Sequence, residues 1–284
     1  ITVKGLKGGH SGGDIHLGRG NANKILNRFL YQMMTTYQED FHLYEFNGGN
    51  LRNAIPREAS AVFSVPEQYK HDIRTALNVF TAEIENELHR VEPDLNILLE
   101  TEPHRDWSID SSTSYRLITS LYGCPHGVYA MSQDIPGLVE TSTNLASVKM
   151  KPENTIRIET SQRSSILSSR DDIATTVRAV FRLAGAKVNW GEGYPGWKPN
   201  PDSEILKVAE ESYKRLFGVD AKVKAIHAGL ECGLFLDKYP ALDMISFGPT
   251  LTGVHSPDER MHIPSVDKFW KHLLDVLAHI PAKN

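Results

Sequence analysis

The order of strand-like and helical patterns over residues 1–190 constrains the fold of this chain more than any other feature. The first round of patterns is a strand, a helix, two strands, a helix and a strand, at residues 1–7, 22–38, 41–46, 59–65, 67–90 and 95–100. The strands alternate apolar and polar residues, and the helices place apolar residues on one face. Such an order predicts an α+β domain with largely antiparallel sheets.

A second round of patterns begins near Ser112. It contains a helix, three strands and a further helix, at residues 114–123, 127–133, 143–150, 154–162 and 171–184. Asp171 and Asp172 would place negative charge at the N-terminus of the last helix. The order strand-helix-strand-strand-helix-strand therefore occurs roughly twice, although no sequence repeat accompanies it.

A segment rich in Pro and Gly at residues 193–203 is a candidate domain boundary. The patterns beyond it are a helix, a strand, a short helix, a strand of the buried type and a closing helix, at residues 203–218, 222–228, 229–239, 241–249 and 265–280. Ser265 is the expected N-cap of the closing helix. This tail is predicted to be α/β, with helices packed on strands.

Composition excludes several classes of function. The net charge is -4 and no Lys/Arg cluster is present that would neutralise a phosphate backbone, so we expect no nucleic-acid partner. No apolar run approaches the ~20 residues of a membrane helix, and no secretory signal opens the chain. Cys124 and Cys232 show no disulfide spacing, which is typical of a reducing, cytoplasmic location.

The Gly-rich loop around His10 admits two chemical interpretations. Gly9 to Gly13 matches G-x-S-x-G, and Ser11, Asp243 and His255 would have the chain order of a serine hydrolase triad. That interpretation is disfavoured, because a nucleophile elbow follows several strands and only a short segment precedes this loop. Alternatively the glycines let the backbone approach a ligand and His10 donates to a developing oxyanion. A tight turn with a surface histidine remains an equal possibility.

Other candidate binding residues lie in loops and at the ends of strands. The loop at 48–56 contains two Gly, two Asn and an Arg, and Asn53 could recognise a carbonyl there. Arg163 follows a strand and suits a carboxylate. Glu231 lies at a strand-helix junction, where a substrate-facing side chain is favoured over a metal site with His227 and Cys232. His255 follows a buried strand at the carboxyl end of an α/β sheet, where ligands gather, and a neutral His can bind zinc.

Five segments together resemble the aminoacyl-histidine dipeptidases (Xaa-His dipeptidases, peptidase D) of the M20 metallopeptidase family. They are KGLKGGHSGGDIHLGRGNAN, FNGGNLRNAIPRE, AGAKVNWGEGYPGW, IHAGLECGLF and SFGPTLTGVHSPDERMHI. The resemblance implies a cytoplasmic peptidase with two zinc ions and a lid domain that mediates homodimerisation. It further implies two ferredoxin-like halves in a lid at residues 1–187. Residues 188–284 would be the C-terminal part of the catalytic domain.

The same resemblance implies roles for single residues. His255 would be a zinc ligand, His10 and Asn53 would polarise the scissile carbonyl of a dipeptide, and Arg163 would grip its C-terminal carboxylate. Glu231 would line the substrate pocket.

The chain departs from the family pattern in its metal ligands. In the family an H-x-D motif, a bridging Asp and a Glu-Glu pair precede the lid, and no such motif in that setting occurs here. Catalytic zinc normally needs three protein ligands and a general base beside the bound water. We therefore expect that an upstream catalytic half is missing and that this chain alone is inactive. The alternatives are a non-catalytic, dimerising peptide-binding lid, or another M20 peptidase or deacylase.

Overall fold

The structure is a computed structural model that describes residues 1–191, 193, 197, 200, 202–224, 227, 231–252 and 259–281, without the side chain of Glu231. It divides into two compact units, Ile1–Gly191 and Glu192–Asn284. No helix of the described part is long and apolar enough to cross a membrane.

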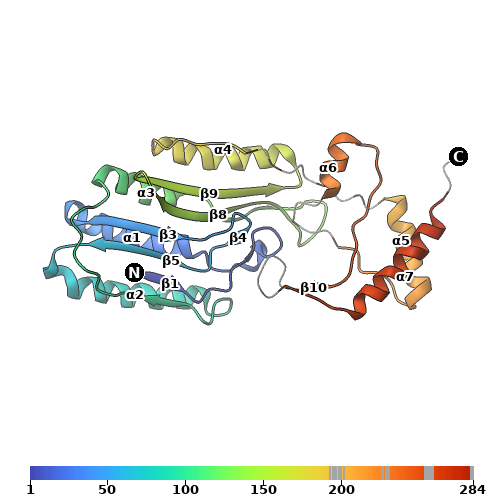
Figure 1. Cartoon of the computed structure of the whole chain (residues 1–284), viewed down its shortest axis with the longest axis horizontal. Coiled ribbons are helices and arrows are strands. Elements are labelled where there is room, and N and C mark those ends of the chain that lie inside the picture. The colour runs from blue at the N-terminus through green and yellow to red at the C-terminus, as the bar shows by residue number, and fades with distance from the viewer. Residues whose placement is uncertain are drawn as a thin grey trace. The chain divides into compact units, whose positions relative to one another are not determined.

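The first half of unit 1 has the predicted order of strands and helices (Figure 1). Its elements are β1 (Thr2–Lys4), α1 (Ala22–Tyr37), β3 (His42–Gly48), β5 (Ala59–Ser64), α2 (Lys70–Leu88) and β6 (Asn96–Leu98). The strands pair antiparallel in the order β6-β1-β5-β3. This β-α-β-β-α-β arrangement is ferredoxin-like, as expected.

The second half extends the same sheet instead of forming a second one. Its elements are α3 (Ser111–Gly123), β7 (Gly127–Met131), β8 (Val139–Lys151), β9 (Thr155–Ser164) and α4 (Leu167–Leu183). β8 pairs antiparallel with β7, with β9 and, through Val148, with Gly48 of β3. The result is a single seven-stranded sheet.

This half has the expected helix, three strands and helix, and no strand lies between β6 and α3. The preceding segment at 101–108 is polar and mostly exposed, with Pro103 near its start, so it offers little apolar surface to bury. Helix α4 also begins four residues before Asp171, so Asp171 and Asp172 lie inside the helix instead of at its N-terminus.

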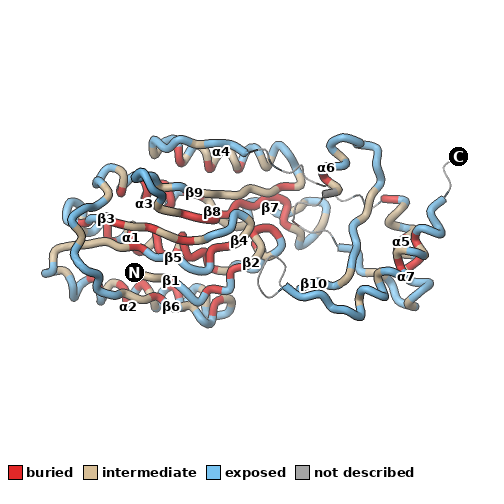
Figure 2. The backbone as a smooth tube through the Cα atoms, in the orientation of Figure 1, coloured by how far each residue is buried: buried red, intermediate tan, exposed pale blue. Residues whose placement is uncertain are grey.

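The core of unit 1 lies between the sheet and its helices (Figure 2). Phe29 of α1, Phe46 of β3, Ile118 of α3 and Leu145 of β8 are fully buried there. Because side chains alternate along a strand, the residues of β8 on either side of the buried Val148 point to the opposite face of the sheet. That face of β8 and β9 is polar.

Helix α1 also holds the two halves together through polar contacts. Asn21 caps the helix by accepting from the backbone N–H groups of Asn23 and Lys24. The Lys24 ammonium donates to the carbonyl oxygens of Leu121, Tyr122 and Cys124, each at 2.8 Å. These carbonyls end α3, so Lys24 satisfies acceptors that the helix itself leaves unpaired.

Unit 2 contains three described helices and one short ladder. The helices are α5 (Glu204–Phe217), α6 (Glu231–Lys238) and α7 (Pro264–His279), and β10 (Leu251–Thr252) pairs with β11 (Arg260–Met261). Helices α5 and α7 pack together, and the buried His272 ring lies 2.8 Å from the carbonyl oxygen of Ala209. Helix α7 exposes Trp270 and Leu277, which are 55% and 57% accessible.

Two predicted strands of the tail are not formed in the described residues. Residues 241–249 and the described part of 222–228 carry no strand pairing. A strand is defined by backbone hydrogen bonds to a neighbouring strand. In the described part of unit 2, no strand pairs with these two segments. Helix α7 also starts one residue before Ser265, with Pro264 in its first turn. Ser265 accepts from the backbone of Thr250 instead of capping the helix.

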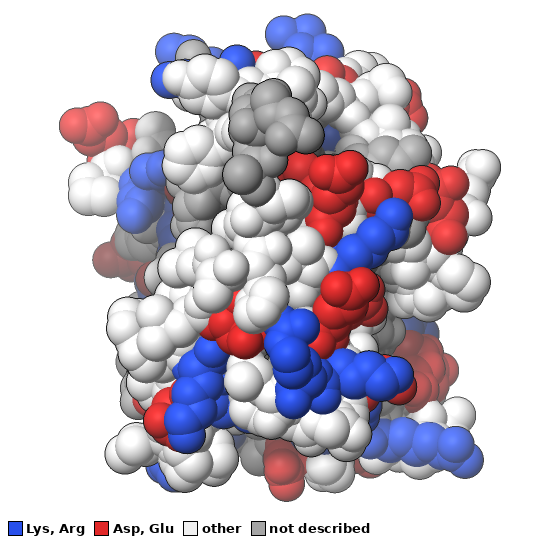
Figure 3. All heavy atoms as spheres, turned by 90° about the vertical axis from the view of Figure 1, so that its right-hand side faces the viewer, with Lys and Arg blue, Asp and Glu red and all other residues white. Residues whose placement is uncertain are grey.

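Charges of both signs are interspersed on the face shown in Figure 3. Lys and Arg side chains alternate there with Asp and Glu side chains, and no continuous basic patch forms among the residues drawn in colour.

Candidate functional site

The Gly-rich loop and the loop at 49–56 meet in a short ladder. Strand β2 (Gly9–His10) pairs antiparallel with β4 (Ala54–Ile55), with His10 opposite Ala54. The backbone N–H of Ser11 donates to the carbonyl oxygen of Asn53 at 2.8 Å. The structure therefore places two of the predicted site residues, His10 and Asn53, beside each other.

The glycine at position 9 makes this close approach possible. Its φ of 138° lies outside the range that other residues readily adopt, and an added Cβ would lie 2.5 Å from the Arg19 side chain. The backbone N–H of His10 donates to Asp14 Oδ2 at 2.8 Å, which fixes the loop from the other side. Arg19 in turn donates to the carbonyl oxygen of Gly8. Gly9 is thus required by the turn.

The hydrogen bonds of the His10 ring define its tautomer. Nδ1 accepts from the backbone N–H groups of Gly13 at 3.0 Å and Gly12 at 3.3 Å. A ring nitrogen that accepts carries no proton, so the neutral imidazole carries its proton on Nε2. His10 therefore presents an N–H donor on the side away from its own loop.

The loop at 49–56 is also attached to the strands of the second half. Asn144 on β8 donates through Nδ2 to the carbonyl oxygen of Ala54 at 2.8 Å. Ser161 on β9 donates through its hydroxyl to the carbonyl oxygen of Arg52 at 3.0 Å. These bonds fix the backbone on both sides of Asn53, whose side chain is half-buried.

Arg163 joins this group from β9. It lies opposite Ser142 of β8, and its Nε lies 3.4 Å from the Ser11 hydroxyl. Burial lowers the pKa of the Arg163 guanidinium, and the positive charge of Arg52 lowers it further. His10, Asn53 and Arg163 are thus brought together within unit 1.

Arg52 lies next to this group and is not among the residues predicted from the sequence. Among the described residues no carboxylate lies within 4 Å of the guanidinium of Arg52 or Arg163. Two like charges held near each other without an acidic partner favour a bound anion, and guanidinium groups bind carboxylates with two parallel hydrogen bonds. The available signal was the position of Arg52, directly before Asn53.

The remaining predicted residues cannot be placed relative to this group. His255 and the side chain of Glu231 lie outside the described residues. Within the described part of the chain, no group of three or more His, Cys, Asp or Glu side chains could hold a metal ion.

The surroundings of Ser11 differ from those of a serine nucleophile. Ser11 is buried and its hydroxyl accepts from Arg163. The preceding β2 belongs to a two-stranded antiparallel ladder, whereas a nucleophile elbow joins a strand of a central sheet to a helix. Asp243, in unit 2, accepts from the backbone N–H of Ile205 at 3.0 Å. This geometry does not support the triad.

Residues 1–92 match the M20 family described as the peptidase dimerisation domain. The chain is 43% identical over 283 residues to the cytosol non-specific dipeptidase of Escherichia coli (strain K12), covering 100% of this chain and 58% of that protein. The crystal structure of aminoacylhistidine dipeptidase from Vibrio alginolyticus matches with a TM-score of 0.86 and 41% identity, covering 100% of this chain and 57% of that one.

The expected resemblance is therefore confirmed along the whole chain. The chain is homologous to these two dipeptidases and spans a little over half of their length.

Proposed function

We propose that this chain is part of a zinc-dependent dipeptidase of the Xaa-His type and that residues 1–187 act as its lid. The observation that carries the proposal is the convergence of His10, Asn53 and Arg163 from three segments of unit 1. An imidazole donor, an amide and a guanidinium can hold a short peptide by its carbonyl and its carboxylate. The identity of 43% to a dipeptidase supports this class of substrate.

In this proposal His10 stabilises the charge that develops on the scissile carbonyl oxygen. Nδ1 is held by two backbone N–H groups, so the Nε2 proton is oriented before the substrate arrives. A donor fixed in advance stabilises an oxyanion more than the ground-state carbonyl, and a single such donor contributes ~10²–10³ in kcat. The amide of Asn53 is the second donor to the same oxygen.

Arg163 and Arg52 hold the C-terminal carboxylate of the dipeptide. Their mutual repulsion is relieved when an anion binds between them, which supports a site for one negative charge. Such a carboxylate clamp makes the enzyme an exopeptidase, because an internal peptide bond has no free carboxylate at the required distance. Glu231 remains a proposed member of the substrate pocket.

The residues of the described chain do not by themselves fit a zinc centre. A catalytic zinc needs three protein ligands, and the described part holds no cluster of that kind. When bound, zinc supplies a water of lowered pKa and polarises the carbonyl. We propose that His255 contributes one imidazole and that the other ligands and the general base are provided outside the described residues. This chain alone is then inactive.

The homodimer forms through residues 1–187 in this proposal. Its support is the match of residues 1–92 to a dimerisation domain. That match also supports a second candidate function, which is a lid that dimerises and binds peptides without catalysing their hydrolysis. Residues 188–284 are proposed as the C-terminal part of the catalytic domain, and a cytoplasmic location is proposed from the cytosolic relative.

The test is His10→Ala in the active dipeptidase that contains this region. We expect kcat for an Xaa-His dipeptide to fall ~10²-fold or more while zinc content stays unchanged. His16→Ala is the matched control, because His16 is exposed in the same loop. Loss of zinc in the His10 variant would contradict the oxyanion role. Peptide binding without turnover in the unaltered protein would favour the non-catalytic lid.

A further inference from the structure

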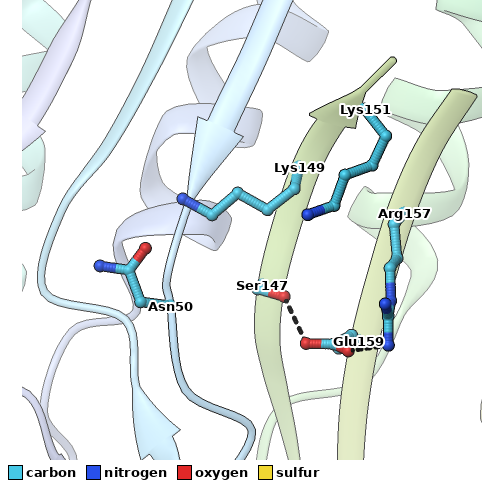
Figure 4. Close-up of a pocket in the computed structure, with 6 residues that line it drawn as sticks. All are labelled: Asn50, Ser147, Lys149, Lys151, Arg157 and Glu159. Carbon is cyan, nitrogen blue, oxygen red and sulfur yellow. Dashed lines mark hydrogen bonds and ion pairs between the residues drawn. The ribbon is translucent and has the colours of Figure 1, made fainter. Parts of the chain in front are cut away.

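A polar hollow lies on the exposed face of β8 and β9, away from the helices (Figure 4). Its volume is about 260 Å³ and its lining residues are Asn50, Ser147, Lys149, Lys151, Arg157 and Glu159. None of the six is apolar, and three of them are cationic. The proposed peptide clamp uses none of these residues.

The register of the strands explains why these side chains gather. Residues 147, 149 and 151 alternate with core residues along β8 and point to one face. On β9, Arg157 lies opposite Lys149 and Glu159 lies opposite Ser147, so they share that face. The lysines and Arg157 are therefore held side by side by the sheet.

Asn50 is placed at the hollow by the turn that follows β3. Gly49 has a φ of 66°, and an added Cβ would lie 1.9 Å from the carbonyl oxygen of Ala146. The turn thus runs directly against β8. Figure 4 shows the Asn50 amide on one side of the hollow and the Lys149 ammonium extending toward it from β8.

The charges in the hollow do not balance. Arg157 is paired with Glu159 at 2.6 Å, and Ser147 donates to the same carboxylate at 3.1 Å. Lys149 and Lys151 have no carboxylate within 4 Å among the described residues. Two positive charges are therefore left without an acidic partner, on a chain whose net charge is -4.

The hollow is separate from the residues around His10. Ser142, which lies opposite Arg163, and Lys149 are seven residues apart on β8. At ~3.3 Å per residue this corresponds to roughly 23 Å along the strand. The hollow and Arg163 therefore lie at different positions along β8 and β9, although Asn50 shares its loop with Arg52 and Asn53.

We propose that the hollow binds a small oxyanion of the phosphate class. The two ammonium groups supply charge-assisted donors and the Asn50 amide supplies a neutral one. The volume of about 260 Å³ is below the ~300 Å³ at which pockets begin to bury drug-sized ligands, which favours a single phosphoryl group with few attached atoms. The lining includes no aromatic ring on which a nucleobase could stack.

Calorimetric titration of the 284-residue chain with inorganic phosphate tests the proposal. Sodium chloride keeps the ionic strength constant, and glycerol phosphate and succinate serve as comparison ligands. We expect saturable phosphate binding that Lys149→Ala/Lys151→Ala weakens at least tenfold. Glycerol phosphate is expected to bind within about threefold of phosphate, and succinate more weakly. Succinate binding that is as tight as phosphate binding and equally weakened by Lys149→Ala/Lys151→Ala would overturn the proposal, and so would phosphate binding unchanged in the double variant.

Two further variants distinguish the effect of side-chain charge on phosphate binding from an effect on the folded structure. Lys149→Arg/Lys151→Arg keeps both charges and is expected to retain binding within about threefold. Glu159→Gln removes the one negative charge and is expected to tighten binding several-fold, whereas weaker binding would contradict the assignment. Lys70→Ala/Arg74→Ala is the control, because it removes two exposed charges from the region of α2. It is expected to leave phosphate binding unchanged, and an equal loss there would show that only net charge matters.

Discussion

Arg52 lies close enough to Arg163 for its positive charge to lower the pKa of the Arg163 guanidinium, adding to the larger effect of burial. The two residues come from different elements, and their relation is fixed by the bond from the Ser161 hydroxyl to the Arg52 carbonyl oxygen. Arg163 is half-buried and Arg52 is exposed, so water screens their mutual repulsion only in part. An anion placed between the two guanidinium groups is attracted by both positive charges and reduces their mutual repulsion. This is the basis of the proposed carboxylate clamp.

This clamp predicts a change in substrate affinity when Arg163 is altered. Arg163→Lys in the active dipeptidase removes the planar, two-pronged donor, and KM for an Xaa-His dipeptide is expected to rise about tenfold or more. Arg52→Ala is expected to act in the same direction with a smaller effect. The corresponding dipeptide amide lacks the carboxylate, so its kcat/KM should change little. Arg182→Lys, at an exposed position on α4, is the control. An equal loss on the acid and amide substrates would contradict the clamp.

The turn at Gly49 predicts a loss of stability when its glycine is replaced. Gly49→Ala introduces strain from the positive φ and a clash with the carbonyl oxygen of Ala146, and we expect the free energy of unfolding to fall by more than ~2 kcal/mol. Gly137→Ala is a matched control, since its φ is 80° but nothing lies within 4 Å of the added Cβ. That variant should lose only ~1 kcal/mol. Urea unfolding compares the two variants. Equal losses in the free energy of unfolding would show that the contact with Ala146 does not contribute to the effect.

His126 predicts a pH dependence of stability. Burial lowers its pKa from 6.5 to about 4, with a smaller effect from the charge of Lys24, and its Nδ1 lies 3.3 Å from Asn21 Nδ2. Between these two values the unfolded chain binds more protons than the folded one. The contribution of His126 is therefore complete above pH 6.5 and is lost as the pH falls toward 4.

The measurement is the free energy of unfolding at pH 7.5 and pH 5 for the native chain and His126→Gln. The native chain is expected to lose about 1–2 kcal/mol more than the variant over this range, since one pKa unit corresponds to ~1.4 kcal/mol. His16→Gln, at an exposed position, should behave as the native chain does. A pH dependence that is the same in all three proteins would refute the assignment.

The order of elements in the first half of unit 1 could be predicted because it depends on local patterns. Alternation over 59–65 and helical spacing over 67–90 match β5 and α2 closely. The start of α4 could not be predicted, because Ile166 precedes the helix without a side-chain cap that would mark the boundary. The absent strand pairing at 241–249 depends on a neighbour, which a local pattern does not reveal.

The site was predictable only in part, and for the same reason. His10, Asn53 and Arg163 were chosen through resemblance, since their distances along the chain do not imply contact. Arg52 was missed because its relation to Arg163 depends on how the loop at 49–56 lies against β9. The tautomer of His10 likewise follows from two backbone N–H groups that only the folded loop brings to its ring.

In the proposed enzyme this chain clamps the peptide, and most zinc ligands are provided outside its described residues. The most direct test is to add zinc to the purified 284-residue chain and to measure both Xaa-His hydrolysis and the zinc bound per chain. We expect no turnover and no tightly bound pair of zinc ions. Dipeptide hydrolysis by this chain with two zinc ions bound would contradict the account.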